Sequence, residues 1–214
     1  AAGRGHEGAV AALLAKGAVV DLAKSNGATP LLVAAQNGHE ATVAALLAKG
    51  AQIDLVDKYG GTPLFIASEN GHEATVAALL AKGAQVDLAK NDGVTPLYVA
   101  SQNGHQATVA ALLAKGAQVD LANKNGSTPL FMASYNGHEA TVAALLAKGA
   151  EVDLAKNDGV TPLLVASQNG HEATVAALLA KGARLDLEVQ GWTPLSIAKD
   201  EGHAKVVALL EAHK

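Results

Sequence analysis

Residues 41–51 read Ala-Thr-Val-Ala-Ala-Leu-Leu-Ala-Lys-Gly-Ala, and the same eleven residues begin again at Ala74, Ala107, Ala140 and Ala173. A second marker, Thr-Pro-Leu, begins at Thr29, Thr62, Thr95, Thr128 and Thr161, and once more at Thr193. Both markers recur every 33 residues, except that the last Thr-Pro-Leu comes one residue early. A fixed period of this length is typical of proteins built from stacked repeats. The early marker predicts that the last repeat has lost one residue between Asp186 and Thr193.

Each repeat opens with the signals of a short helix. Thr29 is a suitable N-cap, and Pro30 is a suitable first helical residue because its missing N–H costs nothing there and its fixed φ suits a helix. The pair Asn37-Gly38 ends this helix, since both residues tolerate the left-handed backbone. A first helix is therefore expected from about Pro30 to Gln36.

The invariant block predicts a second helix in each repeat, from about Glu40 to Lys49 in the first copy. Val43, Leu46 and Leu47 share one face of that helix, at the spacing of an amphipathic segment. Residues 51–55 are expected to form a short extended stretch, and the turn residues 58–61 lead into the next Thr-Pro-Leu.

Neither helix can bury its apolar face alone, so neighbouring repeats must supply the missing surface. The predicted fold class is therefore all-α: a solenoid of about seven stacked helix-turn-helix units with β-turn or hairpin loops. We expect one array over residues 1–214, with a truncated first unit at 1–23, five full repeats at 24–187 and a capping unit at 188–214. Residues 1–6 align with residues 34–39, so the first unit lacks a Thr-Pro-Leu and is expected to be frayed or the remnant of a longer chain. Charges are expected on the outer face of the cap, at Lys199, Asp200, Glu201, Lys205 and Glu211.

Composition argues against several classes of function. A net charge of −4, from 16 basic and 20 acidic residues, gives no strong field for nucleic acid. The longest apolar helical block, residues 43–48, is far shorter than the roughly 18 residues that a membrane-spanning helix needs. Ala1–Ala12 does not resemble a secretory signal, and the chain has no cysteine. We therefore expect a monomer with no membrane or nucleic-acid partner, with the cytoplasm as the default location.

The repeated motifs Gly-x-Thr-Pro-Leu, Asn-Gly-His, Val-x-x-Leu-Leu and Gly-Ala-x-Val-Asp resemble those of the ankyrin repeat family over the whole chain. The resemblance implies the ankyrin fold, with turns and first helices forming a concave groove that grips partner proteins. Ankyrin repeats commonly have histidine after Thr-Pro-Leu, and the hydrogen bond placed on that histidine is lost here. The residues at this position are Leu32, Phe65, Tyr98, Phe131, Leu164 and Ser196. A second departure is aspartate where the family often has asparagine, at Asp54, Asp87, Asp120 and Asp153.

Histidines and aspartates recur at equivalent positions of successive repeats, in two series called ladders below. Such series raise the question of a catalytic or metal-binding role. Seven of the eight histidines follow a glycine, and an aspartate ladder runs from Asp21 to Asp186. Equivalent positions in stacked repeats lie about 10 Å apart, so neighbouring imidazoles cannot share a metal ion. We expect the histidines to hydrogen-bond to the backbone at helix starts. Because catalysis needs different groups that converge, we predict no enzyme activity, no cofactor and no metal site.

Variation among the repeats instead indicates a recognition surface. The second helix is almost invariant, whereas the turn and the first helix vary and contain all six aromatic residues. Aromatic side chains dominate binding hot spots. The predicted partner-binding residues are therefore Lys58, Tyr59, Glu69, Asn91, Asp92, Tyr98, Lys124, Asn125 and Tyr135.

Two questions stay open at this point. Phe65, Tyr98 and Phe131 share a position with leucines, so packing between units is favoured for them over partner contact. Residues 84–116 and 150–182 differ at only three of 33 positions. Such uniformity suits a designed or recently duplicated array with no evolved partner, because specificity requires a difference between surfaces. The leading interpretation is nevertheless a scaffold that binds a protein of unknown identity.

Overall fold

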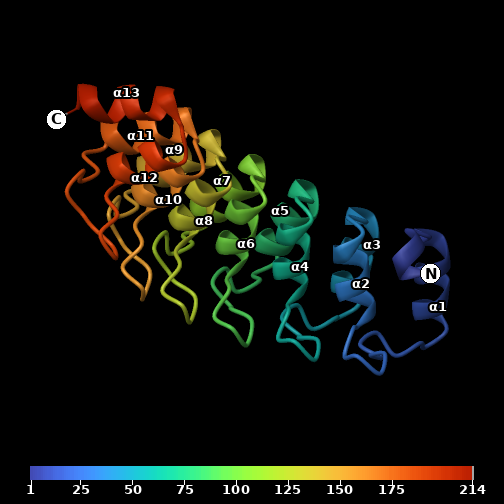
Figure 1. Cartoon of the computed structure of the whole chain (residues 1–214). Helices are drawn as coiled ribbons and strands as arrows, with labels where there is room; N and C mark the ends of the chain where they lie inside the picture. The colour runs from blue at the N-terminus through green and yellow to red at the C-terminus, as the bar shows by residue number, and fades with distance from the viewer. Residues whose placement is uncertain (214) are drawn as a thin grey trace. The chain divides into compact units, whose positions relative to one another are not determined.

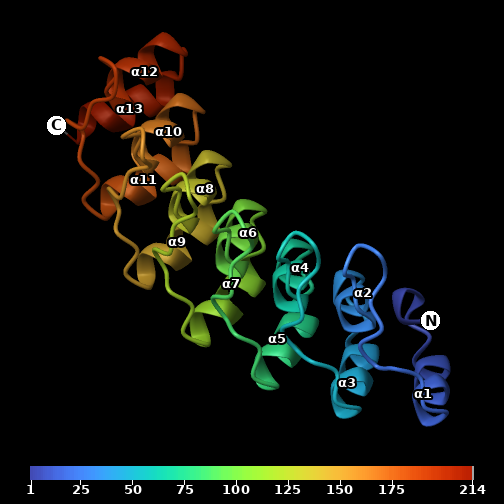
Figure 2. The same ribbon diagram turned by 90° about the horizontal axis from the view of Figure 1, so that it is seen from below.

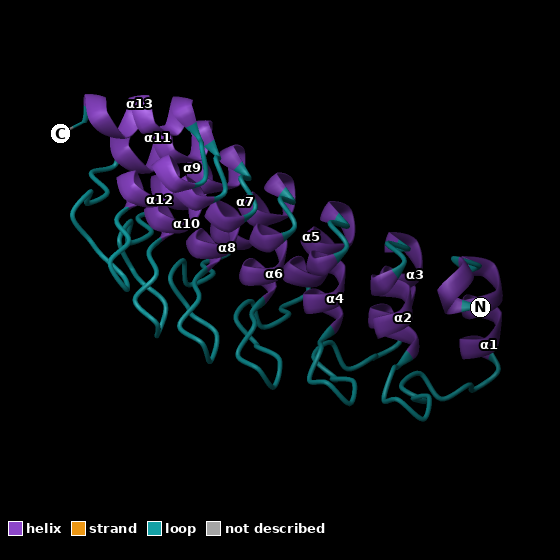
Figure 3. Cartoon of the chain, viewed as in Figure 1, coloured by secondary structure: helices purple, strands orange, loops and turns teal. Residues whose placement is uncertain are grey.

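The computed structural model describes residues 1–213, which form helices joined by long loops (Figures 1 and 3). The first helices of successive repeats are α2 (Pro30–Gln36), α4 (Pro63–Glu69), α6 (Pro96–Gln102), α8 (Pro129–Tyr135), α10 (Pro162–Gln168) and α12 (Pro194–Asp200). The second helices are α1 (Glu7–Ala15), α3 (Glu40–Ala48), α5 (Glu73–Ala81), α7 (Gln106–Ala114), α9 (Glu139–Ala147), α11 (Glu172–Ala180) and α13 (Ala204–Ala212). A single 3₁₀ turn, η1 (Ala2–Arg4), precedes α1. None of these helices has the length and apolar character needed to cross a bilayer.

The helices belong to two compact units, each with two rows of helices. The N-terminal unit comprises residues 1–100 and 110–117, and the C-terminal unit comprises residues 101–109 and the chain from Gln118 onward. In the N-terminal unit, α2 packs against α4, and α3 lies between α1 and α5 (Figure 2). In the C-terminal unit, α8, α10 and α12 form one row, and α9, α11 and α13 form the other. The predicted all-α stack of repeats is thus confirmed within each unit.

The helix boundaries follow from the capping residues. The Thr29 hydroxyl accepts a hydrogen bond from the Leu32 N–H at 3.2 Å, and the same bond recurs at the other Thr-Pro-Leu copies. The first helix therefore spans residues 30–36 as predicted. The second helix ends at Ala48, one residue before the predicted end, because Lys49 lies in the C-cap.

The core of each compact unit lies between its two rows of helices. The leucine of every Thr-Pro-Leu from Leu31 to Leu163 is fully buried, as are the leucines equivalent to Leu46 in the other complete repeats. Within each compact unit, the Thr-Pro-Leu copies thus supply one set of buried leucines and the invariant block supplies the other, whereas Leu195 of the last Thr-Pro-Leu is only half-buried. Burial of these leucines is the main source of stability for a helix pair that cannot fold alone.

The loops contain turns, and no β-strand forms within residues 1–213. The stretch 51–55 is not extended throughout as expected, since Ile53 and Asp54 form a turn and the Asp54 carboxylate accepts a hydrogen bond from the Gln85 N–H. The last loop is shorter, as the early Thr-Pro-Leu predicted. Val189 and Trp192 pair across Gln190 and Gly191, both at positive φ, as in a tight two-residue hairpin turn.

Candidate binding surface

Eight of the nine predicted binding residues are exposed. Lys58, Tyr59, Glu69, Asn91 and Asp92 belong to the N-terminal compact unit, and Lys124, Asn125 and Tyr135 belong to the C-terminal unit. The ninth, Tyr98, is only 5 % exposed, so its ring offers little surface to a partner. Tyr98 therefore belongs to the core, since the residue after Thr-Pro-Leu is buried in all five full repeats.

Hydrogen bonds between successive loops fix the backbone at the loop tips. The Lys58 N–H donates to the Asn26 carbonyl at 3.1 Å, and the Asn157 N–H donates to the Asn125 carbonyl at the same distance. Each tip is also closed internally: the Asp57 carboxylate accepts hydrogen bonds from the Tyr59 and Gly61 N–H groups, both at 2.9 Å. The backbone of such a turn is held in place before any partner arrives, which lowers the entropic cost of binding.

Two tyrosines expose large aromatic surfaces from these fixed backbones. Tyr59 is 58 % exposed at a loop tip, with the Lys58 ammonium 4.7 Å from its ring centroid. Tyr135 is 48 % exposed at the end of α8. Its carbonyl accepts hydrogen bonds from the Asn169 side chain at 2.8 Å and from His171 Nε2 at 2.9 Å. Both positions therefore combine a rigid support with an exposed ring.

The three aromatic residues that follow Thr-Pro-Leu fill space between helices. Phe65 is 1 % exposed, and Tyr98 and Phe131 are each 5 % exposed, so the packing interpretation is confirmed for all three. Two of these rings also contact a lysine of the next repeat: Lys90 Nζ lies 5.1 Å from the Phe65 centroid, and Lys156 Nζ lies 5.3 Å from the Phe131 centroid.

These contacts reveal a two-repeat alternation that the sequence analysis missed. Phe65 and Phe131 are 66 residues apart, and so are Lys90 and Lys156. A repeat with phenylalanine after Thr-Pro-Leu is thus followed by a repeat with lysine at the loop position of Lys90, where the intervening repeats have Asp57 and Asn123. The signal is present in the sequence, but only a comparison of every second repeat reveals it.

The histidine ladder is structural, as expected. His72 Nε2 donates to the Gln36 carbonyl at 3.0 Å, and His138, His171 and His203 make the equivalent bond to the preceding repeat. Each of these rings packs on the glycine before the equivalent histidine one repeat earlier. The glycine therefore serves two purposes: it adopts positive φ at the end of the first helix, and it leaves room for the imidazole of the next repeat.

The aspartate ladder also links neighbouring repeats. Asp21, Asp54, Asp120 and Asp153 each accept a hydrogen bond from the backbone N–H found 31 residues later. Within residues 1–213, no group of three or more histidine, aspartate or glutamate side chains is arranged to hold a metal ion.

Exposed ion pairs shift the pKa values of several surface groups. A hydrogen bond from Lys156 Nζ, at 2.9 Å, lowers the pKa of Asp158, and the Val160 N–H adds to this effect. Hydrogen bonds from the Arg184 guanidinium lower the pKa of Asp186, while the pKa of Arg184 rises. Pairs this exposed contribute little to stability.

The environment of Asp120 disfavours its charged form, so replacing Asp120 by asparagine should stabilise the protein at neutral pH. Burial raises the pKa of Asp120 by more than the hydrogen bond from the Glu151 N–H lowers it, and the Glu151 carboxylate adds repulsion. The folded state therefore holds this proton more tightly than the unfolded state, so stability falls as pH rises through the interval between the unfolded and the raised folded pKa. Asp120→Asn should raise the free energy of unfolding at pH 7 by less than about 1 kcal/mol and leave it unchanged near pH 3.

The control is Asp153→Asn, whose side chain accepts the equivalent backbone hydrogen bond but faces Arg184 in place of Glu151. Urea denaturation at the two pH values measures both variants. An equal gain for Asp120→Asn at both pH values, or an equal gain for the two variants, would contradict the electrostatic explanation.

Comparisons with known proteins agree with this architecture. The family model for ankyrin repeats (three copies) matches residues 1–90, 83–156 and 148–214. The crystal structure of the human ASB11 ankyrin repeat domain is similar, with a TM-score of 0.87 and 31% sequence identity over 98% of this chain and 95% of that chain. Curated protein sequences give no significant match. Because the family model covers the chain from end to end, the protein belongs to the ankyrin repeat family, whose domains generally serve as protein-interaction scaffolds.

Proposed function

We propose that this chain is a non-catalytic scaffold that binds a protein partner through its turns and first helices. The observation that carries the proposal is the exposure of Tyr59 and Tyr135 on hydrogen-bonded backbones. Large exposed aromatic rings on a rigid support are typical of binding anchors. The same variable segments also expose charged and amide side chains, namely Lys58, Glu69, Asn91, Asp92, Lys124 and Asn125.

The two anchors stand at different places in equivalent repeats. Residues 58, 59 and 69 correspond to residues 124, 125 and 135 by a shift of 66. The first set has its tyrosine at the loop tip and a glutamate at the helix end, whereas the second set has an asparagine at the tip and its tyrosine at the helix end. This difference gives two otherwise similar repeats distinct surfaces, which is what discrimination between partners requires.

The test is partner capture by the wild-type chain and by the Tyr59→Ala/Tyr135→Ala variant. We expect binding to weaken at least tenfold in the variant, while the thermal unfolding midpoint changes little, because both tyrosines are about half exposed to solvent. A lysate pull-down identifies the partner by mass spectrometry, and calorimetry with the purified partner then measures the affinity.

The matched control is Lys82→Ala/Lys148→Ala, which changes two exposed residues at the ends of α5 and α9 in the same two repeats. This variant should bind like the wild type. Equal binding by all three proteins would reject the tyrosine anchors, and a lower unfolding midpoint in the tyrosine variant would show that the rings act in stability.

A second candidate is a designed or recently duplicated array with no evolved partner. The observation in its favour is the near identity of residues 84–116 and 150–182, which differ at three of 33 positions. If the wild-type chain retains no protein that the tyrosine variant loses, this description is the better one.

A further inference from the structure

Seven asparagines of the chain directly precede a glycine, and two of them, Asn26 and Asn125, lie at exposed loop tips. Asparagine is a thermolabile residue. A following glycine promotes its loss of ammonia, because without a Cβ the next backbone nitrogen can approach the side-chain amide carbon. The other five asparagines follow or end the first helices, at Asn37, Asn70, Asn103, Asn136 and Asn169.

Hydrogen bonds to backbone carbonyls hold the asparagine side chains at the helix ends. The Asn37 side chain donates to the Val33 carbonyl at 2.7 Å, and the Asn169 side chain donates to the Tyr135 carbonyl at 2.8 Å. Bonds of the same kind hold Asn70 and Asn136. A side chain held in this way must break its hydrogen bond before its amide carbon can turn toward the following glycine.

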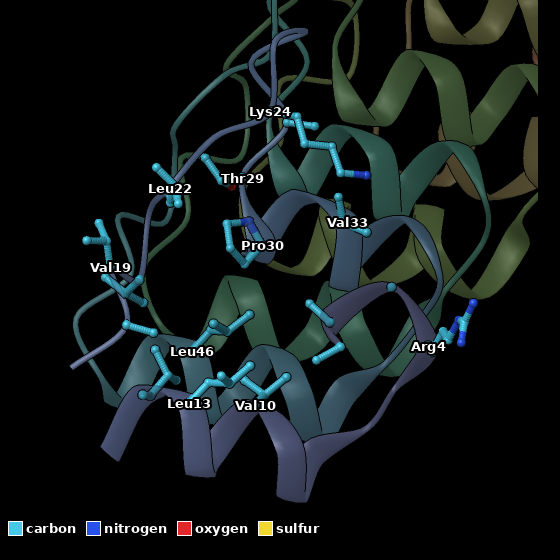
Figure 4. A pocket seen from close by; sticks show the side chains of 17 residues that line it. Arg4, Val10, Leu13, Val19, Leu22, Lys24, Thr29, Pro30, Val33 and Leu46 are labelled. Atoms are coloured by element: carbon cyan, nitrogen blue, oxygen red, sulfur yellow. The ribbon is translucent and has the colours of Figure 1, made fainter. Parts of the chain in front are cut away.

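The loop that contains Asn26 closes through the Asn26 side chain itself. The side-chain carbonyl accepts a hydrogen bond from the Ala28 N–H at 3.1 Å. The loop begins with Lys24, whose ammonium can donate hydrogen bonds but cannot accept this one. Figure 4 labels Lys24 and Thr29, the residues at the two ends of this loop. The two other loops that begin with lysine close in the same way, through Asp92 and Asp158.

The loop that contains Asn125 closes through a different residue. It begins with Asn123, whose side-chain carbonyl accepts hydrogen bonds from the Asn125 N–H at 2.9 Å and from the Ser127 N–H at 3.0 Å. Because the Ser127 N–H is the equivalent of the Ala28 N–H, the Asn125 side chain is not needed to close the loop. Among residues 1–213 the Asn125 side chain has no hydrogen-bond partner, and it is exposed.

The glycine after the asparagine is held equally in the two loops. The Gly27 N–H donates to the Lys24 carbonyl at 2.9 Å. The Gly126 N–H donates to the Asn123 carbonyl at the same distance. Each N–H must leave its carbonyl before the nitrogen can react, so this cost is shared. The hydrogen bond of the asparagine side chain is the difference between the two loops.

We propose that Asn125 is a modification site, the position at which the folded chain deamidates first. The Gly126 nitrogen attacks the Asn125 side-chain amide carbon, and the new C–N bond closes a succinimide ring. The amide nitrogen leaves as ammonia and takes up the proton that the Gly126 N–H gives up. Water then opens the ring at either carbonyl, which leaves aspartate or isoaspartate at position 125. The net reaction consumes one water, releases one ammonia and involves no oxidant or reductant.

Both products change the loop tip. Each adds a negative charge next to Lys124, and isoaspartate also adds a methylene to the backbone between positions 125 and 126. The added methylene displaces the carbonyl that accepts the Asn157 N–H at 3.1 Å. An effect on partner binding rests on the function proposed above, whereas the reaction itself does not.

The test incubates the purified full chain in warm, mildly alkaline buffer, with and without guanidinium chloride. Digestion and fragment mass spectrometry then give the deamidation rate at each asparagine. The denatured chain supplies the intrinsic rate of each site, so the ratio of folded to denatured rates isolates the effect of structure. This ratio should be about three- to tenfold higher for Asn125 than for Asn26, as expected from one hydrogen bond. A ratio for Asn125 equal to that of Asn26, or below it, would overturn the proposal.

Two substitutions carry the same comparison into loops that lack an Asn-Gly pair. Tyr59→Asn places asparagine at the tip of a loop that Asp57 closes, as Asn123 closes the loop of Asn125. Asp92→Asn places asparagine at the tip of a loop that closes through the tip residue. After the same normalisation, the introduced asparagine should deamidate about three- to tenfold faster in Tyr59→Asn than in Asp92→Asn. Similar rates would show that the side-chain hydrogen bond does not control the reaction and would reject the assignment to Asn125.

Discussion

Leu145→Ala should lower the free energy of unfolding by about 2–5 kcal/mol. The Leu145 side chain is fully buried in α9, and α9 packs against α8 and α11. Truncation removes its apolar contacts and leaves a cavity that the neighbouring helices can only partly fill, which is the origin of costs of this size. Urea denaturation of the full chain, followed by far-ultraviolet circular dichroism, measures the loss.

The chain contains its own control for this prediction. Leu13 occupies the equivalent position in α1 but is 52 % exposed, so Leu13→Ala should cost about 1 kcal/mol or less. The two substitutions delete the same atoms from the same repeat position and differ only in burial. Similar costs would show that the invariant leucines do not stabilise the protein through burial.

The sequence predicted the elements of this fold well because each is defined by local chemistry repeated several times. Thr29, Pro30 and the pair Asn37-Gly38 fix the limits of the first helix, and the structure confirms them. The turn at Ile53 and Asp54 was not foreseen, because its geometry depends on a hydrogen bond from Gln85 in the next repeat. Local signals in one sequence do not predict hydrogen bonds between neighbouring repeats.

The candidate binding surface was also predicted only in part. Exposure of Tyr59 and Tyr135 could be predicted from their variable positions, and both are exposed. Tyr98 was predicted both as a binding residue and as a packing residue, and its burial favours packing. The 66-residue spacing of Lys90 and Lys156 is present in the sequence, but the contact of Lys90 with Phe65 depends on which loop lies above which helix, and the structure was needed to show it.

Gly137→Ala should destabilise the protein by about 2–4 kcal/mol, much more than alanine at another glycine of the same repeat. Gly137 has φ 70°, and an added Cβ would lie 2.5 Å from Nδ1 of His171. Positive φ alone costs an alanine about 1–2 kcal/mol. The remainder arises because the imidazole must move, which breaks its hydrogen bond to the Tyr135 carbonyl.

Gly149 separates these two costs. It has φ 87° and no heavy atom within 4 Å of the added Cβ, so Gly149→Ala should cost only the backbone strain. In a His171→Ala background, the cost of Gly137→Ala should fall to that same value, which gives a coupling energy of about 1–2 kcal/mol in a double-mutant cycle. A coupling near zero would mean that the glycine is required for its φ alone. A clear coupling would establish that Gly137 also stabilises the protein by leaving room for the His171 imidazole of the next repeat.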